Sequence, residues 1–529
     1  MEHILPPPAR CRLVPCLPIG ALLATLAVLL PVAAAAQILP PRQVDHLTIT
    51  SDELAGEFLR LAALREAEGM RTAVVTVPWI EANVAADVDL QATIRSFIRA
   101  AHDEWGVAFV LLGGGPSVVP VRYVRNTFYP AGSYTDIPTD LYYAGLDGDW
   151  DANGNQLYGE AYIDADDPGD DADLSPDVSL GRAPVETVAE AARFVDGTLA
   201  ADARADALRS DVLMMANIIF PEYWQPGMPI SLDGAMFAHI LATFLESSPV
   251  KVSTLRMYQY DGGYPADLPL NLVNALAALN GGGHGMVYYN GRASRNWIQI
   301  GSESFVIDHA INLLNAPDYY VMVGIYNDVA RFDVPSLATA LLTAPNGGAA
   351  AFLGSSVPAF PSAVHRLNRV FFEETYTATP IRLGEAADRT RTRYLDETYA
   401  NLVMRWTVLS QVLLGDPALR LGPVPPFGGA VGTPPAAVAT RLLRAAPNPF
   451  NPTTTLTFDL AQAGAVQLEV YAVDGRRVAT LVSGERSAGR HTAVWRGMDD
   501  ADRSVGSGVY LVRLRHAGGI EAQRLVLVR

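Results

Sequence analysis

The sequence predicts a large α/β domain, in which helices cover both faces of a parallel sheet, followed by a small all-β sandwich. From residue 46 to residue 423, continuous apolar runs alternate with amphipathic helical patterns. Such runs are typical of strands that are buried on both faces of a parallel sheet. From residue 456 onward the pattern changes to short strands separated by turn signals such as Asp474-Gly475, which is typical of a sandwich.

The α/β part is expected to place its chemistry at one edge of the sheet. The carboxyl ends of parallel strands share an edge, and ligands of open α/β sheets bind beyond those ends. We expect the buried strands at residues 72–77, 107–112, 213–220, 286–290, 319–326 and 349–354.

A segment rich in Pro, Gly and Ala separates the two parts of the chain. It reads PVPPFGGAVGTPPAAVAT from residue 423 to residue 440, which is typical of a linker. The expected boundaries are therefore 44–423 for the α/β domain, 424–440 for the linker and 441–529 for the sandwich.

The composition supports globular domains and argues against a general nucleic-acid partner. Half of the 529 residues are hydrophobic, which is ample material for buried cores. The chain carries 39 basic and 56 acidic residues, a net charge of −17. Such a charge repels the phosphate backbone of nucleic acids.

Residues 1–36 predict an export signal peptide. A short basic region precedes an apolar, Ala-rich stretch at residues 17–36, and small residues close this stretch as at a cleavage site. An uncleaved membrane anchor is the alternative, because about 20 apolar residues can span a bilayer. Cleavage would remove Cys11 and Cys16, the two cysteines of the chain. The mature protein would then have no thiol, no disulfide and no transmembrane span.

Four motifs in the tail occur in the order found in one known domain. Together they resemble the C-terminal sorting domain of the type IX secretion system. The resemblance implies an immunoglobulin-like sandwich, export by the type IX secretion machinery, and a secreted or cell-surface location. An adhesive or spacer sandwich without a sorting role is the alternative. The motifs are PNPFNP (447–452), VYAVDGRR (470–477), GRHTAVWRG (489–497) and SVGSGVYLVRL (504–514).

Five motifs in the α/β part resemble the gingipain-type cysteine peptidases, peptidase family C25, over about 380 residues. The resemblance implies a caspase-like α/β fold in which a cysteine attacks a peptide carbonyl and a histidine transfers the proton. The motifs are FVLLGGGPSVVP (109–120), TDLYYAGLDGDWDANG (139–154), DVSLGRAPV (177–185), GGAAAFLGSS (347–356) and LLGDPALRL (413–421).

The histidine position of that family reads as arginine in this chain. In the family, the histidine lies in a Gly-His-Gly-Ser turn that follows an apolar strand. Aligning on MVYYN (286–290) places this turn at Gly291-Arg292-Ala293-Ser294. Arg292 cannot act as a general base near pH 7, because a guanidinium is effectively always protonated. His284 precedes the strand instead of following it and is the weaker candidate.

The nucleophile position reads as an aliphatic residue. The family's cysteine aligns with Ile325, and no Cys, Ser or Thr occurs from residue 321 to residue 334. No side chain in this stretch can therefore form an acyl intermediate. The family's third residue, an acid, aligns with Ile219, and Glu222 could replace it only with a shift. The sequence therefore predicts a pseudopeptidase, because losing one member of a nucleophile–base pair costs about as much as losing all of them.

The predicted pseudopeptidase would hold a peptide or protein segment in its ancestral cleft. Arg292 would offer a fork of N–H donors to a carboxylate. The alignment places Arg292 and Ile325 opposite each other, at the carboxyl ends of neighbouring parallel strands, with His284 at the far end of one.

Two other functions remain open from the sequence. One is an active endopeptidase with relocated catalytic residues, such as Ser355 or Ser356 with His284 or His365. The other is a structural surface component in which the α/β part acts as a spacer.

The best-preserved chemical site in the sequence is a calcium-binding loop. Asp149, Asp151, Asn153, Asn155 and Glu160 occupy ligand positions of the twelve-residue calcium loop, with a glycine at its sharp turn. The resemblance also implies a structural calcium at this point. A solvated acidic turn is the alternative. Seven aspartates follow between residues 164 and 177, and we expect a solvated surface loop there, or a second and weaker calcium site.

Overall fold

The computed structural model divides the chain into two compact units, residues 1–427 and residues 428–529. The expected signal peptide, the position Ile325 and most of the expected linker lie outside the described residues. Among the residues that are described, no helix has the length and hydropathy needed to cross a bilayer. The structure describes residues 43–128, 133–161, 169–260, 263–324, 327–425, 427, 441–446, 448, 450–460, 462–472, 476–486, 489–501, 503–517 and 519–528.

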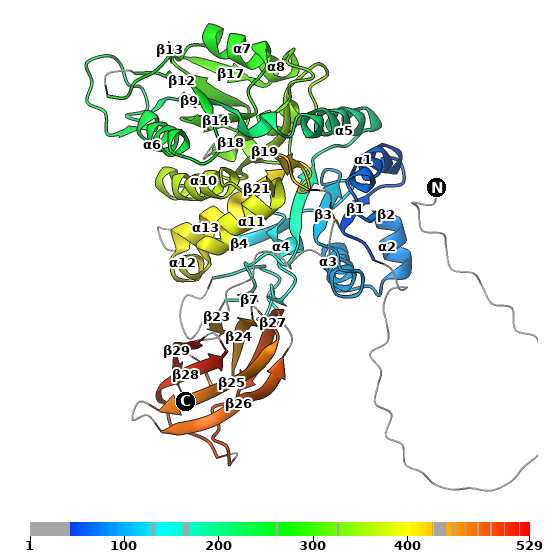
Figure 1. Ribbon diagram of the computed structural model, residues 1–529, viewed down its shortest axis with the longest axis vertical. Coiled ribbons are helices and arrows are strands. Elements are labelled where there is room, and N and C mark those ends of the chain that lie inside the picture. Colours follow the sequence, from blue (N-terminus) through cyan, green and yellow to red (C-terminus); the bar gives the residue numbers. More distant parts are fainter. Residues whose placement is uncertain are drawn as a thin grey trace, which may run out of the picture. The chain divides into compact units, whose positions relative to one another are not determined.

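The first unit is built on an eleven-stranded sheet with helices on both faces (Figure 1). Its buried strands are rich in β-branched and aliphatic residues, which fit a pleated surface that is covered on both sides. In sheet order the strands are β13 (Leu268–Pro269), β12 (Ser253–Tyr258), β9 (Asp211–Ala216), β14 (Met286–Asn290), β18 (Tyr320–Val323), β19 (Ala349–Ser355), β21 (Gln411–Leu414), β8 (Ser179–Ala183), β3 (Phe109–Gly113), β1 (His46–Thr50) and β2 (Thr72–Thr76).

The sheet is not parallel throughout, in contrast to the expectation from the sequence. β13 to β19 pair in parallel, and so do β8, β3, β1 and β2. β21 joins these two runs: it is antiparallel to β19 and meets β8 at the single pair Leu414↔Arg182. β21 overlaps one of the motif segments. Its apolar pattern indicates a buried strand, but not whether that strand runs parallel or antiparallel to its neighbours.

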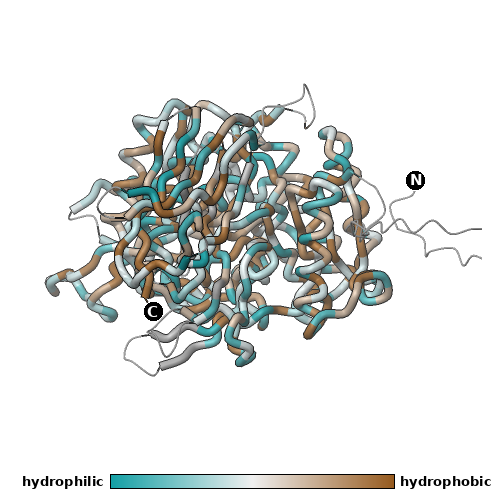
Figure 2. The backbone as a smooth tube through the Cα atoms, turned by 90° about the horizontal axis from the view of Figure 1, so that it is seen from below, coloured by the Kyte–Doolittle hydropathy of each residue, from teal (hydrophilic) through white to brown (hydrophobic). Residues whose placement is uncertain are grey.

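Alternate residues of each strand pack against different helices. Leu213 and Val287 face the layer that contains α1 (Ala55–Ala67) and α5 (Val188–Ala203). Met214 and Tyr288 face α6 (Gly234–Glu246), α10 (Pro361–Thr375) and α11 (Leu383–Arg393). Brown hydrophobic stretches recur along the tube in Figure 2, alternating with teal hydrophilic ones. Because alternate residues of each strand are buried on opposite faces, each strand forms a continuous apolar run, and such runs located the strands in the sequence.

The longer helices of the first unit are amphipathic and cover the sheet. They are α1 (Ala55–Ala67), α2 (Val77–Asn83), α3 (Leu90–Ala100), α5 (Val188–Ala203), α6 (Gly234–Glu246), α7 (Leu272–Gly281), α9 (Leu337–Leu342), α10 (Pro361–Thr375), α11 (Leu383–Arg393), α12 (Leu395–Ala400) and α13 (Leu402–Ser410).

The strand expected at residues 213–220 is broken. It divides at Asn217 into β9 and β10 (Ile218–Phe220), and β10 pairs with β11 (Leu232–Asp233) outside the main sheet. The Asn217 amide group donates hydrogen bonds to Gln259 Oε1 and Gly301 O, both at 3.0 Å. This polar anchor redirects the chain at Asn217, the one polar residue within the apolar run from residue 213 to residue 220.

The second unit is an antiparallel sandwich, which confirms the predicted fold class. One sheet contains β23 (Arg441–Ala446), β24 (Thr454–Leu460) and β27 (Gly489–Trp495). The other contains β26 (Arg477–Arg486), β25 (Gly464–Ala472), β28 (Gly508–His516) and β29 (Gly519–Leu527). Buried side chains such as Leu468, Trp495 and Val512 fill the space between the two sheets.

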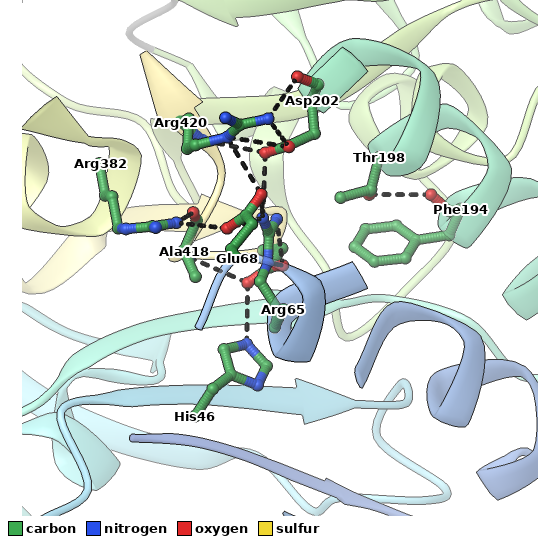
Figure 3. A network of polar contacts seen from close by, with 10 residues as sticks. His46, Arg65, Glu68, Phe194, Thr198, Asp202, Arg382, Ala418 and Arg420 are labelled. Carbon is green, nitrogen blue, oxygen red and sulfur yellow. Dashed lines mark hydrogen bonds and ion pairs between the residues drawn. The ribbon is translucent and has the colours of Figure 1, made fainter. Parts of the chain in front are cut away.

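A buried network of charges links several elements of the first unit to the segment that follows β21. Asp416 is fully buried and accepts hydrogen bonds from Arg65 Nε at 2.9 Å and Arg65 Nη2 at 2.8 Å. Its other oxygen lies 3.0 Å from His46 Nε2. Arg65 also contacts Glu68 and Asp202, each at 3.0 Å (Figure 3). The network therefore ties β1, α1 and α5 to the segment after β21.

The same network is completed by two further arginines. Arg420 Nη2 donates to Asp202 Oδ2 at 2.6 Å, and Arg382 Nη1 donates to Glu68 Oε2 at 3.0 Å. Burial opposes the charged form of Asp202, but the charge of Arg65 and the hydrogen bonds to Asp202 together outweigh burial and lower the pKa of Asp202 to about 2. The stabilisation from Asp202 is therefore present above about pH 4 and is lost as the pH falls through about 2.

Replacing Asp416 tests how much the first unit depends on this network. We expect Asp416→Asn to lower its free energy of unfolding by about 3–5 kcal/mol, because Arg65 would keep a buried charge without its carboxylate. Urea denaturation of the mature chain measures the effect. Glu373→Gln is the matched control, since it breaks an exposed pair with Arg369 and should change the free energy by less than about 1 kcal/mol. Equal effects of both variants would contradict this assignment.

Candidate functional site

The candidate site lies beyond the carboxyl ends of β9, β14 and β18. These three strands are adjacent and parallel, with Met286 opposite Val212 on one side and Val321 on the other. Arg292 follows the end of β14 by two residues, and Gly324 directly follows β18. The position expected for the lost nucleophile, Ile325, comes next and lies outside the described residues.

Arg292 is held in an ion pair with Glu222. Its Nη1 donates to the backbone oxygen of Glu222 at 2.7 Å, and its Nη2 donates to Glu222 Oε2 at 3.2 Å. Its Cζ atom lies 5.2 Å from the ring centre of Tyr223, a cation–π contact. Tyr289 Oη donates to the backbone oxygen of Arg292 at 2.8 Å, which fixes the turn that carries the guanidinium.

Glu222, not Ile219, brings a carboxylate to Arg292. Ile219 is buried and packs against Phe237 and Val364, so its aliphatic side chain belongs to a small core. The break at Asn217 lets the following segment leave the sheet, and Glu222 then reaches Arg292 across its edge. An unbroken strand was expected here, although the polar Asn217 interrupts the apolar run at the bend.

His284 lies at the opposite edge of the sheet from Arg292. It precedes β14, and its Nδ1 contacts Asp211 Oδ1 at the start of β9. Ser253 Oγ donates to the other oxygen of Asp211 at 2.5 Å. Burial raises the pKa of Asp211, but the hydrogen bonds from His284 and Ser253 outweigh burial and lower it. The carboxylate therefore stands between the serine and the histidine, an order in which the imidazole cannot take the serine's proton directly.

The residues proposed for a relocated site have other contacts. Ser355 and Ser356 are buried, and Ser356 Oγ donates to the backbone oxygen of Pro138 at 2.8 Å. His365 stacks on Phe237 with ring centres 4.3 Å apart. Burial lowers the pKa of His365 to about 4, so its ring is neutral near pH 7.

The candidate calcium loop closes upon itself. Glu160 Oε2 accepts hydrogen bonds from Asn153 Nδ2 at 3.1 Å and from Asn155 Nδ2 at 2.6 Å. The last ligand position of the loop therefore folds over the two central ones. Asp149 Oδ1 and Asp151 Oδ1 each accept one backbone N–H, at 3.0 and 2.9 Å. Three carboxylates and two amides form a hard oxygen donor set, which suits calcium.

Asp170 joins this loop, and the sequence analysis did not single it out. Its Oδ2 accepts the N–H of Glu160 at 3.0 Å. Its Oδ1 is buried and has no hydrogen-bond partner. Burial raises the pKa of Asp170 to about 6. A buried carboxylate oxygen without a donor fits a neighbouring cation or a bound proton. Asp170 was one of seven aspartates expected in a solvated loop, and spacing alone did not distinguish it.

A second acidic group lies close by in the chain. Among the described residues, Asp147, Asp173 and Asp177 form a group whose carboxylate oxygens lie within 4.8 Å of one another. Asp177 Oδ2 accepts the N–H of Leu146 at 2.7 Å, and Arg95 donates to nearby backbone carbonyls such as Gly145 O at 2.7 Å. The hydrogen bond from Leu146 gives Asp177 a structural role in the turn.

Comparison with solved structures defines the fold of the first unit. The chain is similar to the complex of Porphyromonas gingivalis RgpB pro- and mature domains, with 17% identity and a TM-score of 0.53, over 92% of this chain and 100% of that one. It is similarly close to the Arg-specific cysteine proteinase gingipain R (RGPB), with 16% identity and a TM-score of 0.52, over 93% and 100% of the two chains. The fold is therefore that of a gingipain.

Comparison with models of protein families assigns the chain to a family. The model of peptidase family C25 matches residues 39–422, and the model of the FlgD Ig-like domain matches residues 446–519. The chain belongs to peptidase family C25, a family of cysteine peptidases, and carries an immunoglobulin-like domain at its C-terminal end. None of the curated proteins matches it.

Removing the Arg292 side chain tests whether it holds the segment around Glu222. We expect Arg292→Ala to increase amide hydrogen exchange of residues 219–224 severalfold, because two hydrogen bonds to Glu222 are lost. The unfolding free energy should fall by less than about 1 kcal/mol, since the Glu222 carboxylate is half exposed. Arg295→Ala is the matched control, and an equal increase in exchange there would contradict the assignment.

Proposed function

We propose that this chain is a secreted or surface-displayed pseudopeptidase of the gingipain type. In this proposal it no longer cleaves peptides and instead holds a peptide or protein segment, or serves a structural role, at the cell surface. The observation that carries the proposal is the ion pair between Arg292 and Glu222 at the edge where the family's histidine aligns.

The chemistry of that pair argues against proton transfer. A guanidinium cannot release a proton near pH 7, so Arg292 cannot accept one from a nucleophile. The sequence from residue 321 to residue 334 offers no Cys, Ser or Thr to attack a carbonyl. Base and nucleophile would both be missing, and covalent catalysis needs the two together.

The same pair supports binding. An arginine has five N–H donors, and Glu222 accepts hydrogen bonds from two of its nitrogens, Nη1 and Nη2. The remaining donors can bind a carboxylate of a peptide segment in the ancestral cleft. Tyr223 lies beside the guanidinium and is 79% exposed, so an aromatic face is available to the same segment.

The proposed location follows from the two ends of the chain. Residues 1–36 have the pattern of an export signal. The immunoglobulin-like C-terminal domain carries the motifs that resemble the type IX sorting domain, and a FlgD Ig-like model matches it. We therefore propose the type IX secretion machinery as a partner of this domain.

Cleavage of a mixed peptide library by the mature chain, residues 37–529, tests the loss of activity. We expect no cleavage by the unaltered protein and measurable cleavage by the double variant Arg292→His/Ile325→Cys, because the fold would then carry both a base and a thiol. Arg295→His/Ile325→Cys is the matched control and should stay inactive.

Cleavage by the unaltered chain would overturn the pseudopeptidase proposal. The variants Ser355→Ala, Ser356→Ala and His284→Ala would then locate the active residues. Failure of the double variant to cleave, with a folded protein, would instead contradict the alignment of Ile325 with the lost cysteine.

We further propose that the loop from Asp149 to Glu160 binds a structural calcium ion. Its five side chains supply hard oxygen ligands, and Glu160 already folds over Asn153 and Asn155. Asp170 Oδ1 adds a buried carboxylate oxygen that lacks a donor. In this proposal both asparagine amides turn their oxygens from the backbone towards the ion.

Thermal unfolding with and without calcium tests this site. Calcium at about ten times its dissociation constant should stabilise the first unit by about 1.4 kcal/mol relative to a chelator. Glu160→Gln should remove this effect, because a bidentate ligand is lost. Asp147→Asn, in the neighbouring acidic group, should retain it. Loss of the effect in Asp147→Asn but not in Glu160→Gln would move the ion to the other group.

A further inference from the structure

One face of the four-stranded sheet in the second unit combines arginines with exposed aliphatic side chains. Along β28, Tyr510, Val512 and Leu514 are buried in the sandwich core. Because successive side chains of a strand point to opposite faces, the residues between them form the outer face. These outer residues of β28 are Val509, Leu511, Arg513 and Arg515.

The strand register extends this face across the whole sheet. Leu511 lies opposite Arg524 of β29 and opposite Tyr471 of β25, which in turn lies opposite Arg477 of β26. Arg515 lies opposite Ile520. We call this surface the cationic sheet face, and it comprises Arg477, Arg513, Arg515, Arg524, Val509, Leu511 and Ile520.

The carboxylate within the cationic sheet face does not neutralise it. Glu469 is buried beneath its neighbours and accepts hydrogen bonds from Arg513 Nη2 at 3.1 Å, Arg477 Nη1 at 3.3 Å and Tyr471 Oη at 2.7 Å. Glu469 thus serves two arginines, of which Arg477 also lies 3.7 Å from Asp500 Oδ2. Arg515 and Arg524 are exposed on either side of them.

The charge of this part of the chain is opposite to that of the rest. Residues 441–529 contain 12 arginines and eight acidic residues, a net charge of +4. The other 440 residues carry a net charge of −21. A basic terminal part on an acidic protein is typical of a segment that contacts an anionic surface.

The aliphatic residues of the cationic sheet face are unusually exposed. Val509 is 40% exposed, Leu511 44% and Ile520 54%. They alternate with arginines, whose long stems can lie along an apolar surface while the charged groups reach outward. A surface that is both apolar and cationic suits the boundary between lipid head groups and acyl chains.

We propose that the cationic sheet face docks on an anionic lipid surface. The guanidinium groups of Arg515 and Arg524 bind lipid phosphates, and Leu511 and Ile520 enter the head-group region beside them. This contact is independent of whether the first unit cleaves peptides. It holds the domain at a membrane surface without a membrane-spanning segment.

The aliphatic residues favour lipid over other anionic partners. A nucleic acid offers phosphates, but exposed Leu and Ile gain nothing from its backbone. An acidic protein surface satisfies the arginines but needs an apolar patch that matches the aliphatic positions. A lipid surface supplies both, because its head groups rearrange around the side chains.

Flotation of the mature chain with phospholipid vesicles tests the proposal. We expect binding to vesicles with about 30% phosphatidylglycerol to exceed binding to pure phosphatidylcholine by at least about 10-fold, and to weaken as salt rises. Arg515→Glu/Arg524→Glu should reduce the partition coefficient at least about 10-fold, because each arginine near an anionic lipid surface strengthens binding severalfold. Leu511→Ser/Ile520→Ser should reduce it without changing the salt dependence.

The matched control changes the same net charge elsewhere in the domain. Arg486→Glu/Arg496→Glu reverses two exposed arginines outside the cationic sheet face, and binding should stay within about twofold of the unaltered chain. An equal loss in the control would show attraction by net charge alone and overturn the proposal. Retention on polyglutamate beads without binding to vesicles would assign the face to an acidic protein and would also overturn it.

Discussion

The first unit depends on the contact between the Asp416 carboxylate and the Arg65 guanidinium. Both side chains are fully buried, and their two hydrogen bonds measure 2.8 and 2.9 Å. A buried charge that loses its partner costs several kcal/mol, so each group requires the other. Asp416 follows β21 and Arg65 lies in the last turn of α1, so this contact fixes the strand that joins the two parallel runs of the sheet. The edge that carries Arg292 belongs to one of these runs.

A second buried pair follows the same principle and explains the family resemblance. Arg182 donates two hydrogen bonds of 2.7 Å to the carboxylate of Asp140 and two of 2.8 Å to the backbone oxygens of Gly114 and Val119. Asp140, Arg182 and Asp416 each belong to a different recognised motif. These motifs thus hold the fold together through groups that cannot change singly. Neither buried pair lies at the candidate site, so the family could be recognised where its catalytic positions could not be matched.

Local patterns predicted most of the fold, and long-range polar contacts account for the rest. The runs at 286–290 and 349–354 became β14 and β19 because apolar side chains on both faces define such strands. The break at Asn217 depends on Gln259 and Gly301, which are distant in the sequence. Glu222 reaches Arg292 only because of that break, and Asp170 reaches the calcium loop across ten residues. In each case a polar group finds a partner that no periodic pattern can indicate.

A substitution at the candidate site costs less folding free energy than a substitution in the buried networks. Arg292 and Glu222 lie at the sheet edge, where water can solvate either charge, so their pair contributes little to stability. A side chain at such a place can change without loss of the fold, so in the proposed pseudopeptidase an arginine at the family's histidine position leaves the fold intact. In that proposal, a group that transfers protons is replaced by one that can only donate hydrogen bonds. In the same proposal, the guanidinium binds a carboxylate at all pH values at which the carboxylate is ionised.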